Sequence, residues 1–351
     1  MIDAHPANGH HHVTAFSVVT VLLGLLLFVY TLERAGLREI AEGIRGVGSG
    51  GFLLILALSG IRLVVRSLAW TRCVEPPDQL AFGDAFPASV IGEALGNLTP
   101  FATFISEPSK AVVVRDRVPL ESGLSAIVVE NIYYTVSVAV VIAMGAVAFL
   151  VSFRNSQALD VASLIALGSM IAVVGGAYGI LRAGARPTTA AVGWLERRGV
   201  DWHWLGAGRE KIETFEERVV SFYRRHPAQL GPVAALEAVF HIAGIAETFV
   251  TLWLVVRIGA VTLVGAFILE ATSRVVNVIF KFVPMRIGVD EAGAGLLAKA
   301  LGIGTAPGVA LAIIRKARIL IWTAVGVLFL LLKGLSLRRT LREAEAVAEQ
   351  E

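Results

Sequence analysis

The chain has 351 residues, of which 56% are hydrophobic and only 17% are charged, and its formal net charge is +3. Soluble domains carry about 25% charged residues, so this composition indicates an integral membrane protein and argues against a soluble one. The net charge is small and the basic residues gather in loops, which gives no support to nucleic-acid binding. The single cysteine, Cys73, excludes a disulfide within the chain, and we expect neither a metal nor a cofactor.

Six apolar runs are long enough to cross a bilayer as helices, which takes about 20 residues. They span about 13–32, 52–70, 120–151, 160–182, 230–257 and 307–332. No Lys or Arg precedes the first run and no small-residue cleavage pattern follows it, so we interpret it as a retained helix and not a signal peptide. We expect the histidines before it to belong to an unstructured tail without a metal-binding role; they are His5, His10, His11 and His12.

Two further apolar stretches, about 80–116 and 260–303, are interrupted by Pro, Gly and charged residues. An irregular backbone survives at membrane depth only where protein or a water-filled cavity satisfies its polar groups. We therefore expect two re-entrant helical hairpins. The fold class is all-α: a single membrane domain over 1–332, followed by a charged cytoplasmic tail at 333–351.

Positive charge in short loops predicts the orientation, because Lys and Arg are retained on the cytoplasmic side. The segment 183–229 is rich in arginine, so we place it in the cytoplasm, and counting spans outward places both termini there as well. Within it, Ile212, Phe215, Val219 and Phe222 share one face of a predicted amphipathic helix at 209–223, which we expect at the membrane interface. We expect a multi-pass protein of a bacterial cytoplasmic (inner) membrane.

The two interrupted stretches resemble each other in their spacing of proline and glutamate. An offset of 184 residues places Pro100 on Pro284 and Glu107 on Glu291. Three predicted crossings lie between them, and this odd number predicts that the second copy enters from the opposite face. Such inverted repeats are typical of transporters with a binding site near the bilayer midplane.

The loop around Glu107, the "GVDEAG" of 288–293 and the "RKAR" of 315–318 resemble the lysylphosphatidylglycerol synthase transmembrane, or flippase-like, family, and also its hopanoid-associated branch. The resemblance covers about 52–332 and implies a membrane protein that moves or handles a lipid. Ser106 stands where the family usually has a glycine, and Met285 and Arg286 stand where it commonly has small residues. About 20 residues follow the last span, so we do not expect a lysyl-transferring catalytic domain.

Charged residues within the apolar stretches predict a polar cavity, because a lone charge at the bilayer centre costs about 2.5–3.5 kcal/mol. We expect Arg286, Arg315 and Arg318 to bind an anionic head group, since a guanidinium pairs with phosphate through two hydrogen bonds. The full set of predicted substrate-binding residues is Glu107, Lys110, Glu130, Arg286, Asp290, Glu291, Arg315 and Arg318.

Other roles are predicted for particular charged residues. Glu107 and Glu291 are candidates for capping the short helices that follow the two loops. Arg62 and Arg66 are expected to extend to the membrane interface. Glu130 is predicted to pair with Arg318 across the repeat axis. Glu237 and His241 form either a proton relay or an ordinary hydrogen-bonded pair.

Three functions are compatible with this pattern. The first is a lipid transporter or flippase. The second is a scaffold that recruits a lipid-biosynthetic enzyme through the cytoplasmic segment. The third is a lipid-modifying enzyme that uses Glu107, Asp290 and Glu291 as acid and base, although we find no recognisable catalytic motif. The expected partners are membrane lipids, a lipid-biosynthetic enzyme and a second copy of the chain. No P-loop is present, so direct coupling to ATP within the chain is not predicted.

Overall fold

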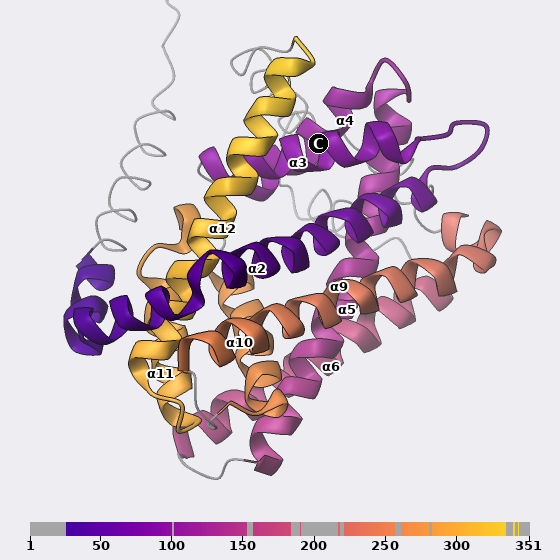
Figure 1. The fold of residues 1–351 in the computed structure, drawn as a ribbon. Coiled ribbons are helices and arrows are strands. Elements are labelled where there is room, and N and C mark those ends of the chain that lie inside the picture. Colours follow the sequence, from indigo (N-terminus) through magenta and orange to yellow (C-terminus); the bar gives the residue numbers. More distant parts are fainter. Residues whose placement is uncertain are drawn as a thin grey trace, which may run out of the picture.

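The computed structural model describes residues 26–99, 102–152, 157–183, 221–256, 261–280 and 283–334, together with residues 190, 217, 340 and 343. The N-terminal histidines, most of the first predicted span, most of the amphipathic helix predicted at 209–223 and nearly all of the tail lie outside these residues. The described part is helical, which confirms the all-α prediction (Figure 1).

Long helices occupy the predicted spans. They are α2 (Leu37–Cys73), α5 (Leu120–Ser152), α6 (Gln157–Ala183), α9 (Pro227–Val256) and α12 (Thr305–Leu332). Among the described helices, α2, α5 and α9 are long and apolar enough to cross a membrane. The predicted number of six crossings stays a prediction, since α12 carries three basic residues and the first span is largely outside the described part.

Large apolar side chains on the outside of the bundle support a membrane location. Ile165 and Ile171 of α6 are 67% and 61% exposed, and Leu331 and Leu332 at the end of α12 are 64% and 74% exposed. Soluble monomers rarely present contiguous apolar surface of this kind. In a bilayer the same side chains contact lipid chains.

Two pairs of short helices occupy the interrupted stretches. The first pair is α3 (Phe82–Leu98) and α4 (Ala102–Val114), and the second is α10 (Leu263–Ile279) and α11 (Val289–Ala300). The predicted breaks are confirmed, whereas the re-entrant course of the two pairs stays a prediction. Gly92 lets α4 approach α3, because a Cβ there would lie 2.7 Å from the backbone oxygen of Ser106.

The break between α10 and α11 has an unusual backbone. A 3-10 turn, Pro284–Arg286, contains Met285 and Arg286 at φ 48° and 49°, a region that side-chain-bearing residues seldom occupy. Such residues cost about 1–3 kcal/mol each and cluster at functional sites. Gly288 follows at φ 81°, and its N–H donates to the Glu291 carboxylate at 2.8 Å, which caps α11.

The helices pack in pairs that join the N-terminal part of the bundle to the C-terminal part. α2 lies against α9 in the centre of the bundle (Figure 1), α3 packs on α12, and α10 packs on α5. The α2–α9 pair is antiparallel, because Gly51 faces Leu254 near one end and Arg62 contacts Glu247 farther along. Each half also has an apolar core: one joins α2 to α5 around Trp70, and the other joins α9 to α12 around Leu252.

Candidate substrate site

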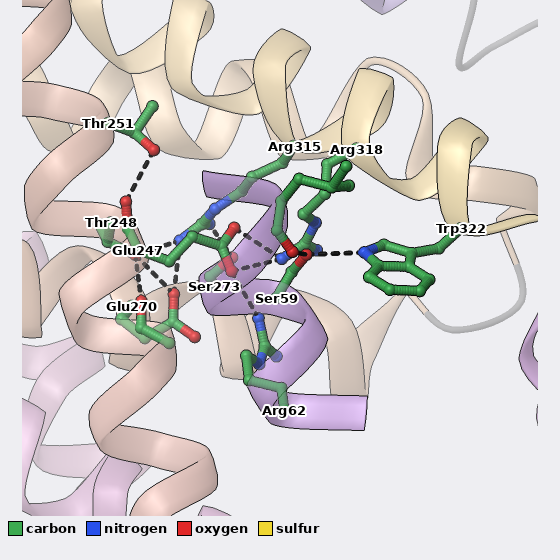
Figure 2. A network of polar contacts seen from close by, with 12 residues as sticks. Ser59, Arg62, Glu247, Thr248, Thr251, Glu270, Ser273, Arg315, Arg318 and Trp322 are labelled. Carbon is green, nitrogen blue, oxygen red and sulfur yellow. Dashed lines mark hydrogen bonds and ion pairs between the residues drawn. The ribbon is translucent and has the colours of Figure 1, made fainter. Parts of the chain in front are cut away.

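Two buried glutamates organise a charged cluster between α2, α9, α10 and α12 (Figure 2). Glu247 of α9 is 1% exposed. Arg318 of α12 donates to both of its carboxylate oxygens at 2.6 and 2.5 Å, and Arg62 of α2 lies 3.2 Å from one of them. One carboxylate thus holds two guanidinium groups.

Glu270 of α10 makes the second centre of this cluster. Its carboxylate accepts hydrogen bonds from Arg274 at 2.6 Å and from Arg315 at 2.5 Å, and from the Thr248 hydroxyl at 2.9 Å. Arg315 also donates to Ser273 at 2.8 Å. Here again two guanidinium groups share one carboxylate.

Helical spacing brings these side chains together. Residues three or four apart lie on one face of a helix, as Arg315 and Arg318 do on α12 and Glu270 and Arg274 do on α10. Figure 2 shows the two α12 arginines reaching across to the acids. Next along the same face of α12, the indole N–H of Trp322 donates to Ser59 of α2 at 2.8 Å. This face of α12 is therefore polar over two turns, although the helix lies in an apolar stretch.

A cavity of about 60 Å³ opens beside the cluster, between α10, α11 and α12. Its charged lining consists of Arg62, Glu270, Arg274, Arg286, Asp290, Arg315 and Arg318. Five arginines and two acids line the cavity. Glu247 lies outside this lining but pairs with Arg62 and Arg318, so the arginines exceed the nearby carboxylates by two. The volume is enough for a few water molecules or a small anionic group, but not for a whole lipid.

Arg286 and Asp290 form the α11 side of the cavity, where the strained turn ends. The Arg286 guanidinium lies 3.4 Å from the Asp290 carboxylate, and its side chain is 27% exposed. Lys316 of α12 lies 2.7 Å from Glu291 and 3.5 Å from Asp290. Of the cavity arginines, Arg286 has the longest contact to its carboxylate partner, so it is the arginine best placed to exchange that partner for a ligand.

A second cluster lies in the N-terminal half. Arg66 of α2 donates to Glu130 of α5 at 2.8 Å and to Asn131 at 3.2 Å. On α4, Lys110 bonds both carboxylate oxygens of Glu107 at 2.8 Å. In this cluster each cation has its own carboxylate.

Glu237 and His241 of α9 both contact the hydroxyl group of Ser137. The His241 ring nitrogen Nε2 lies 2.9 Å from Ser137 of α5, and Ser137 donates to Glu237 at 3.4 Å. Both residues are buried, with Glu237 2% exposed and His241 5% exposed. The contact joins α5 to α9, and a proton-relay role stays a prediction.

Comparison with known proteins adds one finding. Residues 17–332 match the family model described as lysylphosphatidylglycerol synthase TM region. The chain belongs to this family. Neither the search of curated proteins nor the search of solved structures gave a match. The resemblance seen in the sequence is thus confirmed at the level of the lysylphosphatidylglycerol synthase TM family, and its hopanoid-associated branch stays a prediction.

The predicted substrate-binding residues of this family member fall into two places. The cavity is lined by Arg286, Asp290, Arg315 and Arg318, whereas Glu291 is not part of the lining and pairs with Lys316. Glu107, Lys110 and Glu130 lie in the N-terminal cluster. The structure thus brings four of the eight residues together at one cavity.

Three finer predictions are wrong. Glu130 does not pair with Arg318, because Glu130 binds Arg66 and Arg318 binds Glu247. Arg62 and Arg66 do not extend to the interface: they point into the bundle, where the buried glutamates supply counter-charges, and their side chains are 18% exposed. Glu107 is not a cap, because α4 begins five residues earlier and Glu107 pairs with Lys110.

Sequence reasoning missed Glu247 and gave no role to Glu270 and Arg274. A signal for Glu247 was present, since it is a lone acid in the apolar run 243–256 and such a residue needs a partner. Its partners lie 185 residues before it and 71 residues after it, so no local pattern identifies them.

Proposed function

We propose that this protein moves an anionic lipid between the two leaflets of a membrane. The head group passes through the arginine-lined cavity while the acyl or isoprenoid chains stay in the bilayer. The observation that carries the proposal is the excess of positive charge around the cavity, where five arginines share three carboxylates, those of Glu247, Glu270 and Asp290. An anionic head group compensates this charge in a place that water reaches poorly.

Guanidinium groups suit a phosphate-bearing head group. Arginine stays charged when buried and binds phosphate through two parallel hydrogen bonds. Buried Arg62 and Arg274 each have an Nε atom without a hydrogen-bond partner among the described residues. These N–H groups are donors that a phosphate oxygen or water can satisfy.

Helix packing that fits the predicted inverted repeat supports the proposed transport. The unit α2–α3–α4–α5 corresponds to α9–α10–α11–α12, and the packing of α3 on α12 has its counterpart in that of α10 on α5. The corresponding helices α2 and α9 run antiparallel, which is the arrangement expected for two units related by a two-fold axis in the membrane plane. Transporters with this symmetry alternate access by moving one repeat against the other. The small cavity corresponds to an occluded step of such a cycle.

The proposed setting is a bacterial cytoplasmic membrane with both termini in the cytoplasm. Contacts between distant segments agree with this orientation. Arg115, after α4, pairs with Glu343 of the tail, and Glu75, after α2, lies 3.5 Å from His226. Counting the predicted spans outward from the arginine-rich segment 183–229 places all four positions on the cytoplasmic side. A lipid-biosynthetic enzyme or a second copy of the chain would bind at this side.

Reconstitution tests the proposal. Purified protein in liposomes is given fluorescent phosphatidylglycerol, a polyisoprenyl phosphate or a hopanoid lipid in one leaflet, and chemical quenching of the outer leaflet measures its movement. We expect transfer of at least one anionic lipid, and Arg286→Gln to slow it about tenfold or more, because a charge-assisted hydrogen bond contributes about 1.5–3 kcal/mol.

The matched control is Arg38→Gln, since the Arg38 side chain is 90% exposed and pairs with Glu42 on the surface. This variant should transport as the wild type does. If none of the three lipids is transferred, the proposal is contradicted. A chemically altered lipid in the liposomes would instead make the protein an enzyme.

A further inference from the structure

The net charge around the cavity can be counted from its ion pairs. The arginines of the lining and the lysine that contacts Asp290 give six positive charges, on Arg62, Arg274, Arg286, Arg315, Lys316 and Arg318. The carboxylates that pair with them give four negative charges, on Glu247, Glu270, Asp290 and Glu291. Six minus four leaves a surplus of two positive charges among the described residues, so the lysine and its partner do not alter the surplus found for the arginines.

Hydrogen-bond donors remain available at this cavity. Arg274 is 3% exposed, yet its Nε atom has no hydrogen-bond partner among the described residues, and the same holds for the buried Nε atom of Arg62. The Arg286 guanidinium lies 3.4 Å from Asp290, which is a long contact, and Asn277 of α10 adds an amide group to the lining. Buried N–H groups need an acceptor. These donors suit a ligand that carries several acceptor oxygens.

The volume of the cavity limits the size of that ligand. It is about 60 Å³. A buried water molecule needs roughly 10–15 Å³ of such space, so the cavity has room for about four to six groups the size of water. A terminal phosphate with its three free oxygens is of this size. The phosphoglycerol group of phosphatidylglycerol is larger, because its phosphate carries a second ester with glycerol.

Charge separates the same two kinds of phosphate. A phosphate monoester carries a charge of about −1.5 to −2 at pH 7 and has three strong acceptor oxygens. A phosphodiester carries a single negative charge and has two free oxygens. A dianion therefore compensates both surplus charges of the cavity, whereas a monoanion leaves one buried positive charge without a counter-charge, which is unfavourable where water is excluded.

We propose that the cavity is selective for lipid phosphate monoesters, such as phosphatidic acid or a polyisoprenyl phosphate, over phosphodiesters such as phosphatidylglycerol. The terminal phosphate accepts hydrogen bonds from the Nε groups of Arg62 and Arg274 and from Arg286. Inorganic phosphate has the same chemistry, so the experiment must separate it from the lipid. This inference rests on the proposed function, because it names the substrate class of the same cavity.

Three lipids with one common fluorescent acyl chain test the selectivity in proteoliposomes. Phosphatidic acid is a monoester, phosphatidylmethanol is a diester that differs from it by one methyl group, and phosphatidylglycerol is a diester with a larger group. Serum albumin extracts the fluorescent lipid from the outer leaflet, and the rate in protein-free liposomes is subtracted. At about pH 7.5, where the monoester is a dianion, we expect phosphatidic acid to move about tenfold or more faster than phosphatidylmethanol, the effect of one further charge-assisted hydrogen bond. Phosphatidylglycerol should be slower still.

The pH dependence separates the effect of charge from that of size. The second pKa of a phosphate monoester is about 6, so its dianionic fraction rises about fourfold between about pH 5.5 and about pH 7.5. We expect the ratio of phosphatidic acid transfer to phosphatidylmethanol transfer to rise by about the same factor. Both lipids meet the same protein groups at each pH, including Glu237 and His241 of α9, so the ratio reports the charge of the lipid.

Variants test whether the charge surplus sets this preference. Arg286→Gln lowers the surplus from two to one and should reduce the transfer ratio about threefold or more. Asp290→Asn raises the surplus to three and should not reduce the ratio. The control is Arg38→Gln, on the exposed surface of α2, which should keep the wild-type ratio. Thermal unfolding in detergent identifies variants that fail to fold.

Some results overturn the selectivity alone, and others overturn the proposed function as well. Equal transfer of phosphatidic acid and phosphatidylmethanol, or a ratio that does not change with pH, overturns the selectivity while the proposed function stands. Transfer of phosphatidic acid that continues in excess inorganic phosphate assigns the cavity to the lipid. If no lipid is transferred, the proposed function fails and the selectivity with it; stabilisation of the protein by inorganic phosphate would then assign the cavity to free phosphate.

Discussion

The two halves of the bundle contain similar helices but balance charge differently. In the N-terminal half, Arg66 and Lys110 face Glu130 and Glu107, one cation for each carboxylate. In the cavity cluster, to which α2 contributes Arg62, four arginines share two carboxylates; they are Arg62, Arg274, Arg315 and Arg318, on Glu247 and Glu270. The ion pairs of the N-terminal half are neutral, and those of the cavity cluster carry two surplus positive charges.

The difference explains why the cavity lies in the C-terminal half. Neutral buried pairs satisfy themselves and can close on one another, as Lys110 and Glu107 do. Surplus guanidinium groups repel each other and need water or an anion between them, because burying an uncompensated charge costs several kcal/mol. A polar cavity beside Glu270 and Arg315 provides that space.

The largest effect is expected when the shared carboxylate of Glu247 is neutralised. Glu247→Gln leaves both Arg318 and Arg62 without a counter-charge, so we expect a loss of about 3–5 kcal/mol in the free energy of unfolding. Thermal unfolding in detergent measures it.

The matching change in the N-terminal half is Glu130→Gln. It removes the charge partner of one arginine, Arg66, which keeps its contacts with Asn131 and with the Tyr134 ring. We expect a smaller loss than for Glu247→Gln, about 2–3 kcal/mol. A loss equal to or larger than that of Glu247→Gln would contradict the contrast between shared and separate carboxylates.

The next comparison concerns two close helix crossings, one in each half, at which a glycine of one helix faces the neighbouring helix. A Cβ at Gly326 of α12 would lie 2.5 Å from the backbone oxygen of Val90, and a Cβ at Gly145 of α5 would lie 2.2 Å from the Ala271 side chain. Both Gly→Ala variants should cost about 1–3 kcal/mol. Gly326→Ala should cost more, since the backbone of α3 yields less readily than a methyl group. Chemical denaturation in detergent measures both.

The control for these glycines is Gly168→Ala in α6. Nothing lies within 4 Å of the added Cβ, so this variant should be as stable as wild type or slightly more stable. A destabilised Gly168→Ala would show that the losses at Gly145 and Gly326 do not report on their crossings.

Glu291 and Glu107 align under the 184-residue offset but have different roles, because Glu291 lies in the first turn of α11 and Glu107 lies farther inside α4. Glu291→Ala removes the cap of α11 and the contact with Lys316, so we expect a loss of about 1–2 kcal/mol. Glu107→Ala should cost less, because it loses a contact with partly exposed Lys110 and no cap. Hydrogen exchange of the first turn of α11 measures the cap directly and should rise only in Glu291→Ala.

The smallest effect is expected at the surface. Arg38 and Glu42 form an ion pair whose side chains are 90% and 58% exposed. Glu42→Gln should change the free energy of unfolding by about 0.5 kcal/mol or less. A larger change in the same thermal assay would mean that the assay does not separate buried from exposed pairs.

Local patterns in the sequence account for much of the architecture. Apolar runs predicted the helices, and proline with glycine and charge predicted the breaks that separate α3 from α4 and α10 from α11. Glu291 was recognisable as a cap because a carboxylate near the start of a helix accepts its free N–H groups. Arg286, Arg315 and Arg318 were recognisable because arginines in an apolar stretch need partners.

What the sequence by itself determined, then, is the membrane class, the helices and which charges must be buried. Only the tertiary structure decided their partners, because an ion pair depends on which helix faces meet, and α2, α9 and α12 are far apart in the chain. Arg62 and Arg66 looked like interfacial residues until α9 and α5 supplied Glu247 and Glu130. Charge at a single position is a property of the sequence, whereas the balance of charge around a cavity is a property of the packing.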